Sequence, residues 1–408
     1  MIKKWFNNIG PGTLVAAAFI GPGTVTLCTL AGVNFGTHLL WAMLLSIFAT
    51  IVLQEMAARL GIVSQRGLSE VLRHEIVKPG LRNFMMLLIL SAIVIGNAAY
   101  EAGNISGGVL GLETILGSIT VDFGSFSLNM LSFSIGVIAF ILLFLGNYKV
   151  LEKILVVLVL LMSVSFVITA IITKPDIIEV VKGMLVPSFP DNSLFMIIGL
   201  IGTTVVPYNL FLHASLVKEK WKSDKDLSHA KKDTFISIIL GGLVSMAIII
   251  SAAGIPSGSI NNGADLALGL EPLYGAFAKY FLAIGLFAAG ITSAITAPLA
   301  AAFVAKGCLG WEDNMKSLRF RCVWGGILFL GVLFSSIGIK PIEIIKFAQV
   351  ANGMLLPIIV GVLLWVMNKK TILGEHSNTK IQNLFGLCIL VITIFLGLRS
   401  ILKVFNIL

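Results

Sequence analysis

Long apolar stretches separated by short polar segments dominate the chain. Crossing the apolar part of a bilayer takes about 20 residues of helix. Stretches that meet this requirement lie at about 10–33, 38–60, 84–112, 127–146, 152–173, 192–217, 234–254, 273–305, 322–338, 342–368 and 382–402. The third and eighth are long enough to tilt or bend. The pattern predicts an all-α integral membrane protein with eleven transmembrane helices.

The composition excludes a water-soluble protein. Hydrophobic residues make up 57% of the 408 residues, charged residues 12%, and the mean hydropathy is +0.99. A soluble domain carries about 25% charged residues. The cysteines are predicted to be small apolar packing residues, because none shares the spacing of a zinc site or a disulfide framework; they are Cys28, Cys308, Cys322 and Cys388. We expect no cofactor.

The net charge of +9 follows from the distribution of lysine and arginine among the loops. With the N-terminus placed inside, the inner loops hold 22 of these residues and the outer loops hold 5. Loops rich in Lys and Arg stay on the cytoplasmic side. We therefore expect a cytoplasmic N-terminus, an extracytoplasmic C-terminus and no nucleic-acid partner. The short loops and the lack of a cleavable signal favour a bacterial inner membrane, with lipid as the surrounding partner.

Two of the predicted helices are interrupted at matching places. The first contains Gly21-Pro22-Gly23-Thr24, and the sixth contains Val206-Pro207-Tyr208-Asn209. Proline inside a helix removes a backbone hydrogen bond and clashes with the preceding turn. Paired breaks in corresponding helices of two repeats mark a transporter site near the bilayer midplane. The alternative is a pair of simple proline kinks, which membrane helices tolerate.

At these breaks the sequence resembles the Nramp family of divalent-metal transporters. Segments similar to the family's helices 1, 2, 6, 8 and 10 are Gly10–Gly32, Gln54–Val63, Thr203–Val217, Ala288–Thr296 and Gln349–Pro357. The resemblance implies a LeuT-like inverted repeat of five plus five helices, an eleventh helix, helices 1 and 6 broken at the midplane, and alternating access coupled to protons. It implies one transmembrane domain over 1–408, with repeats at about 10–173 and 192–368 and the extra helix at 382–402.

The sequence departs from the family at its metal ligands. The family motif Asp-Pro-Gly-Asn in helix 1 is replaced by Gly21-Pro22-Gly23-Thr24, and Met-Pro-His in helix 6 is replaced by Val206-Pro207-Tyr208. A carboxylate, an amide and a thioether are therefore absent from the positions that would hold a metal. Neutral oxygens hold a dehydrated divalent cation less tightly than carboxylates do.

A small anionic or polar solute fits these replacements better. A broken helix exposes free N–H groups and the positive end of its dipole, which bind anions. The favoured substrate is a carboxylate such as citrate, or a metal–carboxylate complex. A neutral solute remains open because no Lys or Arg lies near the breaks. Predicted substrate-binding residues are Gly21, Gly23, Thr24, Thr203, Val206, Tyr208, Asn209, Gln349 and Asn352.

Ionisable groups inside the membrane predict a proton pathway. Glu101 lies in the middle of helix 3, where Asn97 and Asn104 share its face at helical spacing. The family's acidic proton-pathway residue aligns near Asn104. His213 lies one turn after Asn209 in helix 6. The predicted proton-pathway residues are Glu101, Asn104 and His213. The alternatives are a hydrogen-bonded structural carboxyl and a packing histidine.

The sequence is compatible with three functions. The first is a proton-coupled secondary transporter of a small anionic or polar solute, and the second is a divalent-metal transporter with relaxed selectivity for Mn²⁺, Fe²⁺ or Mg²⁺. The third is a sensor built on a transporter scaffold. An enzyme is not expected, because the sequence contains no P-loop, no GxSxG motif and no HExxH motif.

Overall fold

Apolar helices form nearly all of the structure, a computed structural model that describes residues 20–122, 127–146, 149–256, 258, 260–311 and 315–404. The α-helices are α3 (Pro22–Phe35), α4 (Leu40–Ser64), α5 (Leu68–Glu75), α6 (Pro79–Leu116), α7 (Met130–Leu145), α8 (Lys149–Ile172), α9 (Ile177–Leu185), α10 (Leu194–Thr204), α11 (Pro207–Lys220), α12 (Leu227–Ala252), α13 (Gly263–Leu266), α14 (Glu271–Tyr274), α15 (Ala278–Leu309), α16 (Leu318–Ser336), α17 (Pro341–Met367), α18 (Lys370–Leu373) and α19 (Lys380–Val404). Short 3₁₀ helices lie at Asp224–Asp226, Ala267–Leu270, Gly275–Phe277 and Gly374–His376.

Helix length and composition agree with a polytopic membrane protein. Within the described residues, nine helical segments are long and apolar enough to cross a bilayer, and α7 is a shorter apolar helix of 16 residues. Many large apolar side chains are exposed, as expected where lipid is the solvent; examples are Phe133, Phe140, Phe329, Phe347 and Phe395. Exposure of these apolar side chains would be unfavourable in water, but it is favourable in contact with lipid.

The structure corrects several predicted boundaries. Helix α6 is longer than the predicted stretch, and α15 begins at Ala278, after a series of short turns. Of the first stretch, 10–33, only residues from 20 onward lie among the described residues. The stretch 127–146 begins with a strand: β1 (Thr120–Asp122) pairs antiparallel with β2 (Ser127–Asn129), so the chain is not purely α-helical.

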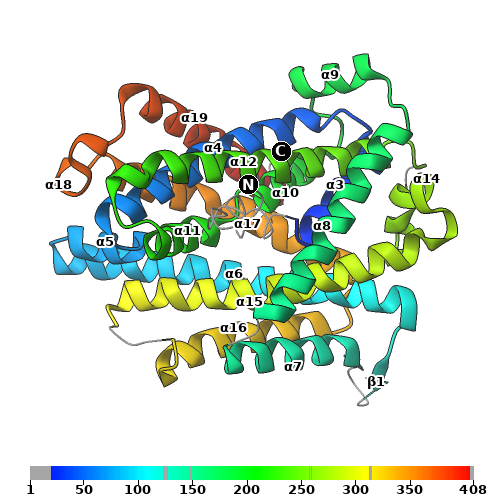
Figure 1. The fold of residues 1–408 in the computed structure, drawn as a ribbon, viewed down its shortest axis with the longest axis horizontal. Coiled ribbons are helices and arrows are strands. Elements are labelled where there is room, and N and C mark those ends of the chain that lie inside the picture. Colours follow the sequence, from blue (N-terminus) through cyan, green and yellow to red (C-terminus); the bar gives the residue numbers. More distant parts are fainter. Residues whose placement is uncertain are drawn as a thin grey trace, which may run out of the picture.

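The helices pack in two groups around the broken ones. Figure 1 shows α6 and α15 running side by side with α7 and α16 beyond them, and α4, α11 and α12 on the other side of the molecule. The short helices α5 and α18 lie at one end of the bundle, and α9, α14 and β1 lie at the other. Helix α17 packs against α6, α10 and α3, and α19 packs against α17.

Glycine makes the closest of these contacts possible. Gly108 of α6 and Gly290 of α15 face each other, so a Cβ atom on Gly290 would lie 2.7 Å from the Gly108 Cα. In lipid, small residues let helix backbones approach and gain van der Waals contact. The pair fixes α6 against α15 at the depth of the broken helices.

Candidate functional site

The predicted break in the sixth helix is confirmed. Helix α10 ends at Thr204 and α11 begins at Pro207, with Val206 in an extended conformation (φ −77°, ψ 122°) between them. Proline is favoured at the first position of a helix, where its missing N–H costs nothing. The Asn209 N–H donates to the Val206 carbonyl at 3.0 Å, so the restart is tight.

The first break is described on one side only. Helix α3 starts at Pro22, and Gly21 precedes it in an extended conformation (φ −85°, ψ 176°). Gly107 of α6 lies directly against the Pro22 ring, and a side chain at position 107 would collide with it. The half of this helix before residue 20 lies outside the described residues.

The two breaks meet at a pair of hydroxyl groups. The Oγ1 atoms of Thr24 and Thr203 lie 2.7 Å apart and share a hydrogen bond, although the residues are 179 positions apart in the sequence. Thr24 lies in the first turn of α3, and Thr203 lies in the last turn of α10. Both side chains are buried. The structure therefore brings together two residues that were predicted separately.

Gln349 of α17 lies between the same two helices. Its side-chain amide occupies the space beside Gly23, and its backbone carbonyl lies against Gly202. A Cβ atom at either glycine would collide with Gln349. The Gln349 Oε1 atom is buried and has no hydrogen-bond partner. Three helices thus converge on one polar point, with an amide oxygen left available.

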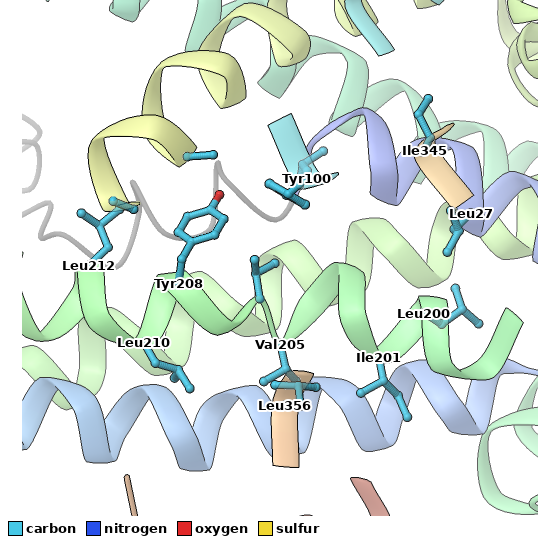
Figure 2. Close-up of a cluster of buried hydrophobic side chains, with 14 of the residues drawn as sticks. Leu27, Tyr100, Leu200, Ile201, Val205, Tyr208, Leu210, Leu212, Ile345 and Leu356 are labelled. Carbon is cyan, nitrogen blue, oxygen red and sulfur yellow. The ribbon is translucent and has the colours of Figure 1, made fainter. Parts of the chain in front are cut away.

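Tyr208 lies in the first turn of α11, directly after Pro207. Figure 2 shows its ring on the side of α11 that faces away from α4, whereas Leu210 points toward α4. The rings of Tyr208 and Tyr100 of α6 meet edge to face, with centroids 5.4 Å apart. The Tyr208 hydroxyl is buried near the hydroxyls of Tyr100 and Thr296, but it makes no well-formed hydrogen bond. The ring contact joins α11 to the helix that carries Glu101.

The polar face of α6 is divided between two neighbouring helices. The Asn97 Nδ2 atom donates to the Ala297 carbonyl of α15 at 2.9 Å, whereas Glu101 packs against Gly331 of α16. The Asn104 Nδ2 atom donates to Glu101 Oε2 at 3.4 Å, and Glu101 Oε1 has no partner. Glu101 and Asn104 are therefore a pair, while Asn97 joins two helices.

His213 lies beyond Asn209 on α11 and has a partner that sequence reasoning did not assign to the site. Its Nδ1 atom lies 2.7 Å from Gln54 Oε1 of α4, and its Nε2 atom has no partner. Because the amide oxygen accepts, Nδ1 carries the hydrogen and Nε2 presents a lone pair. The signal for Gln54 was present, since it is a polar residue inside an apolar stretch.

The remaining polar atoms at the breaks are also unpartnered. Asn209 has neither Oδ1 nor Nδ2 bonded, and Asn352 has a free Nδ2. A buried polar group without a partner costs about 1–3 kcal/mol. Within the described residues, no group of three or more His, Cys, Asp or Glu side chains is placed to hold a metal. The junction is a set of neutral groups that a polar ligand would satisfy.

Charged groups are scarce near these atoms. Arg59 is buried at the end of α4 that leads to α5. There it forms an ion pair with Glu55 at 3.1 Å and donates a hydrogen bond to Asn378 at 2.8 Å. Glu55 and Arg59 are four residues apart, so they share one face of α4. Glu101 is a buried carboxyl. It directly follows Tyr100, whose ring contacts Tyr208. No buried lysine or arginine lies at the breaks within the described residues.

A surface cavity lies away from the breaks. It encloses about 420 Å³ at the start of α10 and is lined by residues 189–194 and Arg399. None of the predicted site residues lines it. Since Thr24, Thr203, Tyr208 and Asn209 are all buried, this structure represents a closed conformation.

Replacing Thr203 with valine is expected to loosen the junction of the breaks. Valine keeps the shape but loses the hydrogen bond to Thr24, which is worth about 1 kcal/mol net. We expect the Tm of the purified protein to fall by about 1–2 °C. Thr204→Val is the matched control, because the Thr204 hydroxyl bonds the Leu200 carbonyl of its own helix at 3.1 Å. Equal losses in the two variants would show that the cross-break bond contributes nothing.

Comparisons with known proteins identify the family. The model of the natural resistance-associated macrophage protein-like family matches residues 12–403. The divalent metal cation transporter MntH of Staphylococcus saprophyticus is 28% identical over 99% of this chain and 93% of its own, and MntH of Caldanaerobacter subterraneus is 26% identical over 95% and 91%.

Solved structures give the same fold. A mutant of the Eremococcus coleocola manganese transporter matches 98% of this chain and 87% of its own, with a TM-score of 0.76 and 21% identity. Mhp1, a nucleobase-cation-symport-1 family transporter in a closed conformation, matches 97% and 93% with a TM-score of 0.60 and 13% identity. The LeuT-like fold and the family resemblance are confirmed, and the chain therefore belongs to the Nramp family of multi-pass membrane transporters.

Proposed function

We propose that this protein is a secondary active transporter of divalent cations, which it binds with part of their water shell. The observation that carries the proposal is the set of buried, unpartnered oxygens at the breaks, on Tyr208, Asn209 and Gln349. Coordinated water molecules donate hydrogen bonds, so they need acceptors. These neutral oxygens supply acceptors without requiring the ion to lose its whole water shell.

The donor set favours a hard, partly hydrated ion. Mg²⁺ dehydrates reluctantly and keeps several waters in proteins. Selection of a transition metal by softness takes thiolate, thioether or imidazole ligands, and Val206 stands where the family has methionine. We therefore expect weak discrimination between Mn²⁺ and Mg²⁺. The names of the relatives, divalent metal cation transporters, support a cation as cargo.

The carboxylate expected from the sequence is less well supported. That expectation relied on free N–H groups where the broken helices restart. In the structure both restarts begin with proline, at Pro22 and Pro207, and the Asn209 N–H is already bonded to the Val206 carbonyl. Glu101 adds a carboxyl on the helix that contacts Tyr208, which would repel an anion when ionised.

We assign proton coupling to Glu101, with Asn104 as its hydrogen-bond partner. A carboxyl inside the membrane is costly and marks proton relays in transporters. Glu101 Oε1 is unpartnered and therefore available to a water molecule or a proton donor. His213 extends the polar route along α11. In this proposal the two repeats move relative to each other, so that the site is exposed alternately to the two sides of the membrane. The end of the bundle that carries α5 faces the cytoplasm, and the N-terminus lies on that side.

Uptake into proteoliposomes tests the cargo. Vesicles carrying the purified protein would be given Mn²⁺, Mg²⁺ or Ca²⁺ under an inward proton gradient, and, separately, radiolabelled citrate with and without a chelator. We expect saturable uptake of Mn²⁺ and Mg²⁺ with rates that differ by less than about tenfold, which corresponds to a discrimination between the two ions of less than about 1.4 kcal/mol.

Uptake of citrate in the absence of divalent ions would contradict the proposal. Citrate uptake that persists when divalent ions are chelated would return the protein to the carboxylate hypothesis. Citrate uptake that requires a divalent ion would identify a metal–carboxylate complex as the cargo. Protein-free vesicles and vesicles containing Thr203→Val report leakage and impaired binding, respectively.

A further inference from the structure

The broken helix α11 is joined firmly to α4. The Gly61 backbone of α4 lies directly against the Ala214 carbonyl, so any side chain at position 61 would collide with α11. One and a half to two turns earlier along α4, Gln54 bonds His213 at 2.7 Å. Close backbone packing and a buried hydrogen bond at two levels indicate that α4 and α11 move together.

A second firm pair is formed by α6 and α15. Gly290 and Gly108 let these helices touch, and Gly111 lies against the Ala283 carbonyl. The Asn97 Nδ2 atom adds a hydrogen bond to the Ala297 carbonyl at 2.9 Å. These contacts extend along the length of both helices, so α6 and α15 form the second rigid pair.

The candidate site lies between the two pairs. The rings of Tyr208 and Tyr100 meet across this boundary, and Figure 2 shows Leu212 on the same side of α11 as Tyr208. Leu212 and Tyr208 are buried. Because α11 packs directly against α15, separation of these two helices would open a route along α11 from the breaks.

Helix α5 spans this boundary at the end of the bundle. On one side it contacts α15: Ser69 packs directly against Gly307, and Arg73 Nη1 donates to the Cys308 carbonyl at 2.8 Å. Its apolar face is buried through Leu68, Val71 and Leu72. Ser69 is buried, and α5 packs more extensively against α15 than against any other helix, so α5 stays with α15.

The contacts of α5 with α11 are of a different kind. Lys218 Nζ lies 3.1 Å from Glu70 Oε2, and the Lys218 and Glu70 side chains are 21% and 36% exposed. Gly67 lies beside Ser215, with a Cβ atom built on Gly67 2.7 Å from the Ser215 Oγ. A partly exposed ion pair contributes little stability. The α11 side of α5 is therefore the side that can be released and remade.

We propose that α5 is a latch that closes the site at this end of the molecule. It remains attached to α15, and it holds α11 through the Glu70–Lys218 ion pair and the Gly67–Ser215 contact. Release of these two contacts lets α11 separate from α15 and opens the route from the breaks. This inference rests on the proposed transport function, because a latch is needed only where the site alternates between open and closed.

A disulfide tests the latch directly. Gly67→Cys and Ser215→Cys would place two Cβ atoms about 4 Å apart, within the 3.5–4.5 Å that a disulfide requires. The Gly67 backbone has φ −71°, a value that any residue adopts, and Ser215→Cys replaces the hydroxyl that a Gly67 side chain would otherwise meet. The background would be Cys322→Ala and Cys388→Ala, because these two cysteines are exposed. Oxidation should reduce Mn²⁺ uptake more than twentyfold, and a reducing agent should restore it.

Matched variants separate the disulfide from its substitutions. Each single cysteine variant should transport Mn²⁺ equally with and without oxidant. Formation of the disulfide would be verified by mass spectrometry of the intact protein. A quantitatively formed disulfide that leaves Mn²⁺ uptake unchanged would overturn the latch.

A second measurement does not depend on the cargo. Leu212→Cys in the same background reports access to the face of α11 that is covered in the closed state, and its rate of reaction with a soluble maleimide would be measured. Glu70→Gln should raise that rate about two- to fivefold, as expected for loss of a partly exposed ion pair. The control is Glu343→Gln, which removes the Glu343–Lys346 pair at 3.0 Å on α17.

The two measurements distinguish the possible failures. If the reduced double-cysteine protein carries no Mn²⁺ but Glu70→Gln still raises labelling of Leu212→Cys, the proposed cargo is wrong and the latch stands. If Glu70→Gln leaves labelling at the rate of the Glu343→Gln control, the latch is wrong whatever the cargo.

Discussion

Gly21→Asp is expected to tighten Mn²⁺ binding about a hundredfold, which corresponds to about 2.7 kcal/mol. Gly21 precedes Pro22 with φ −85° and ψ 176°, a conformation that any residue adopts, so the backbone does not oppose the change. At an effective dielectric constant of about 20, two unit charges 4 Å apart interact by about 4 kcal/mol. Desolvation of the new carboxylate offsets part of that gain.

The control for this substitution is Gly21→Asn, which has the same size and no charge. We expect it to change Mn²⁺ affinity by less than about threefold, within the roughly 0.65 kcal/mol that a neutral ligand adds or removes. Calorimetric titration of both variants with Mn²⁺ and Mg²⁺ measures the effect. Equal affinities for Asp and Asn would mean that position 21 does not face the cargo, and the oxygens of Tyr208, Asn209 and Gln349 would then be the wrong site.

Hydropathy predicted the helices well because lipid leaves few alternatives. A backbone inside a bilayer must satisfy its own hydrogen bonds, so an apolar stretch of sufficient length becomes a helix. The break at Val206 was also predictable, since Pro207 cannot continue the helix before it. The pairing of β1 with β2 was not, because these strands are three residues long and lie next to an apolar helix.

Contacts between distant segments were the part that the sequence could not supply. Thr24 and Thr203 were both expected in the site, yet nothing in their spacing indicated a mutual hydrogen bond. The role of Gln349 depends on Gly23 and Gly202 leaving room for it. Such pairings depend on how helices cross, which periodicity within one helix does not encode.

Helical spacing also overstated how closely the polar face of α6 acts as one surface. Asn97 and Glu101 are one turn apart, and helical spacing places them on one face of the helix. In the structure Asn97 donates a hydrogen bond to α15, whereas Glu101 packs against α16, where Gly331 leaves space for its side chain. A helix face is wide enough to serve two neighbours, and this division leaves Glu101 with Asn104 as a separate polar pair.

The amphipathic character of α5 was visible but was not used. Leu68, Val71 and Leu72 have the i, i+3, i+4 spacing of a helix with one apolar face. The basic residues in and around this segment predict only that it lies on the cytoplasmic side. The charge of α5 indicates the side of the membrane on which it lies. Its apolar spacing indicates that one face of the helix packs against the rest of the protein. The two signals are independent, and both are needed to recognise a helix at the membrane surface.

Glu101→Gln is expected to abolish proton-driven uptake while leaving ion binding nearly intact. Glutamine has the same shape, so the packing against Gly331 and the hydrogen bond with Asn104 can persist. It cannot take up or release a proton. We expect Mn²⁺ uptake under an inward proton gradient to fall at least tenfold, and the equilibrium affinity for Mn²⁺ to change by less than about threefold.

The split between uptake and binding assigns the role of Glu101. Uptake would be measured in proteoliposomes at several imposed proton gradients, and binding by calorimetry on the same preparation. Glu113→Gln is the control, because Glu113 lies near the C-terminal end of α6, about three turns beyond Glu101, and accepts a hydrogen bond from Asn129 Nδ2 at 3.0 Å. A parallel loss of affinity and uptake would make Glu101 a ligand for the cation. Unchanged uptake that still rises with the gradient would leave Glu101 a structural carboxyl, and the proton route would then have to run through His213 and Gln54.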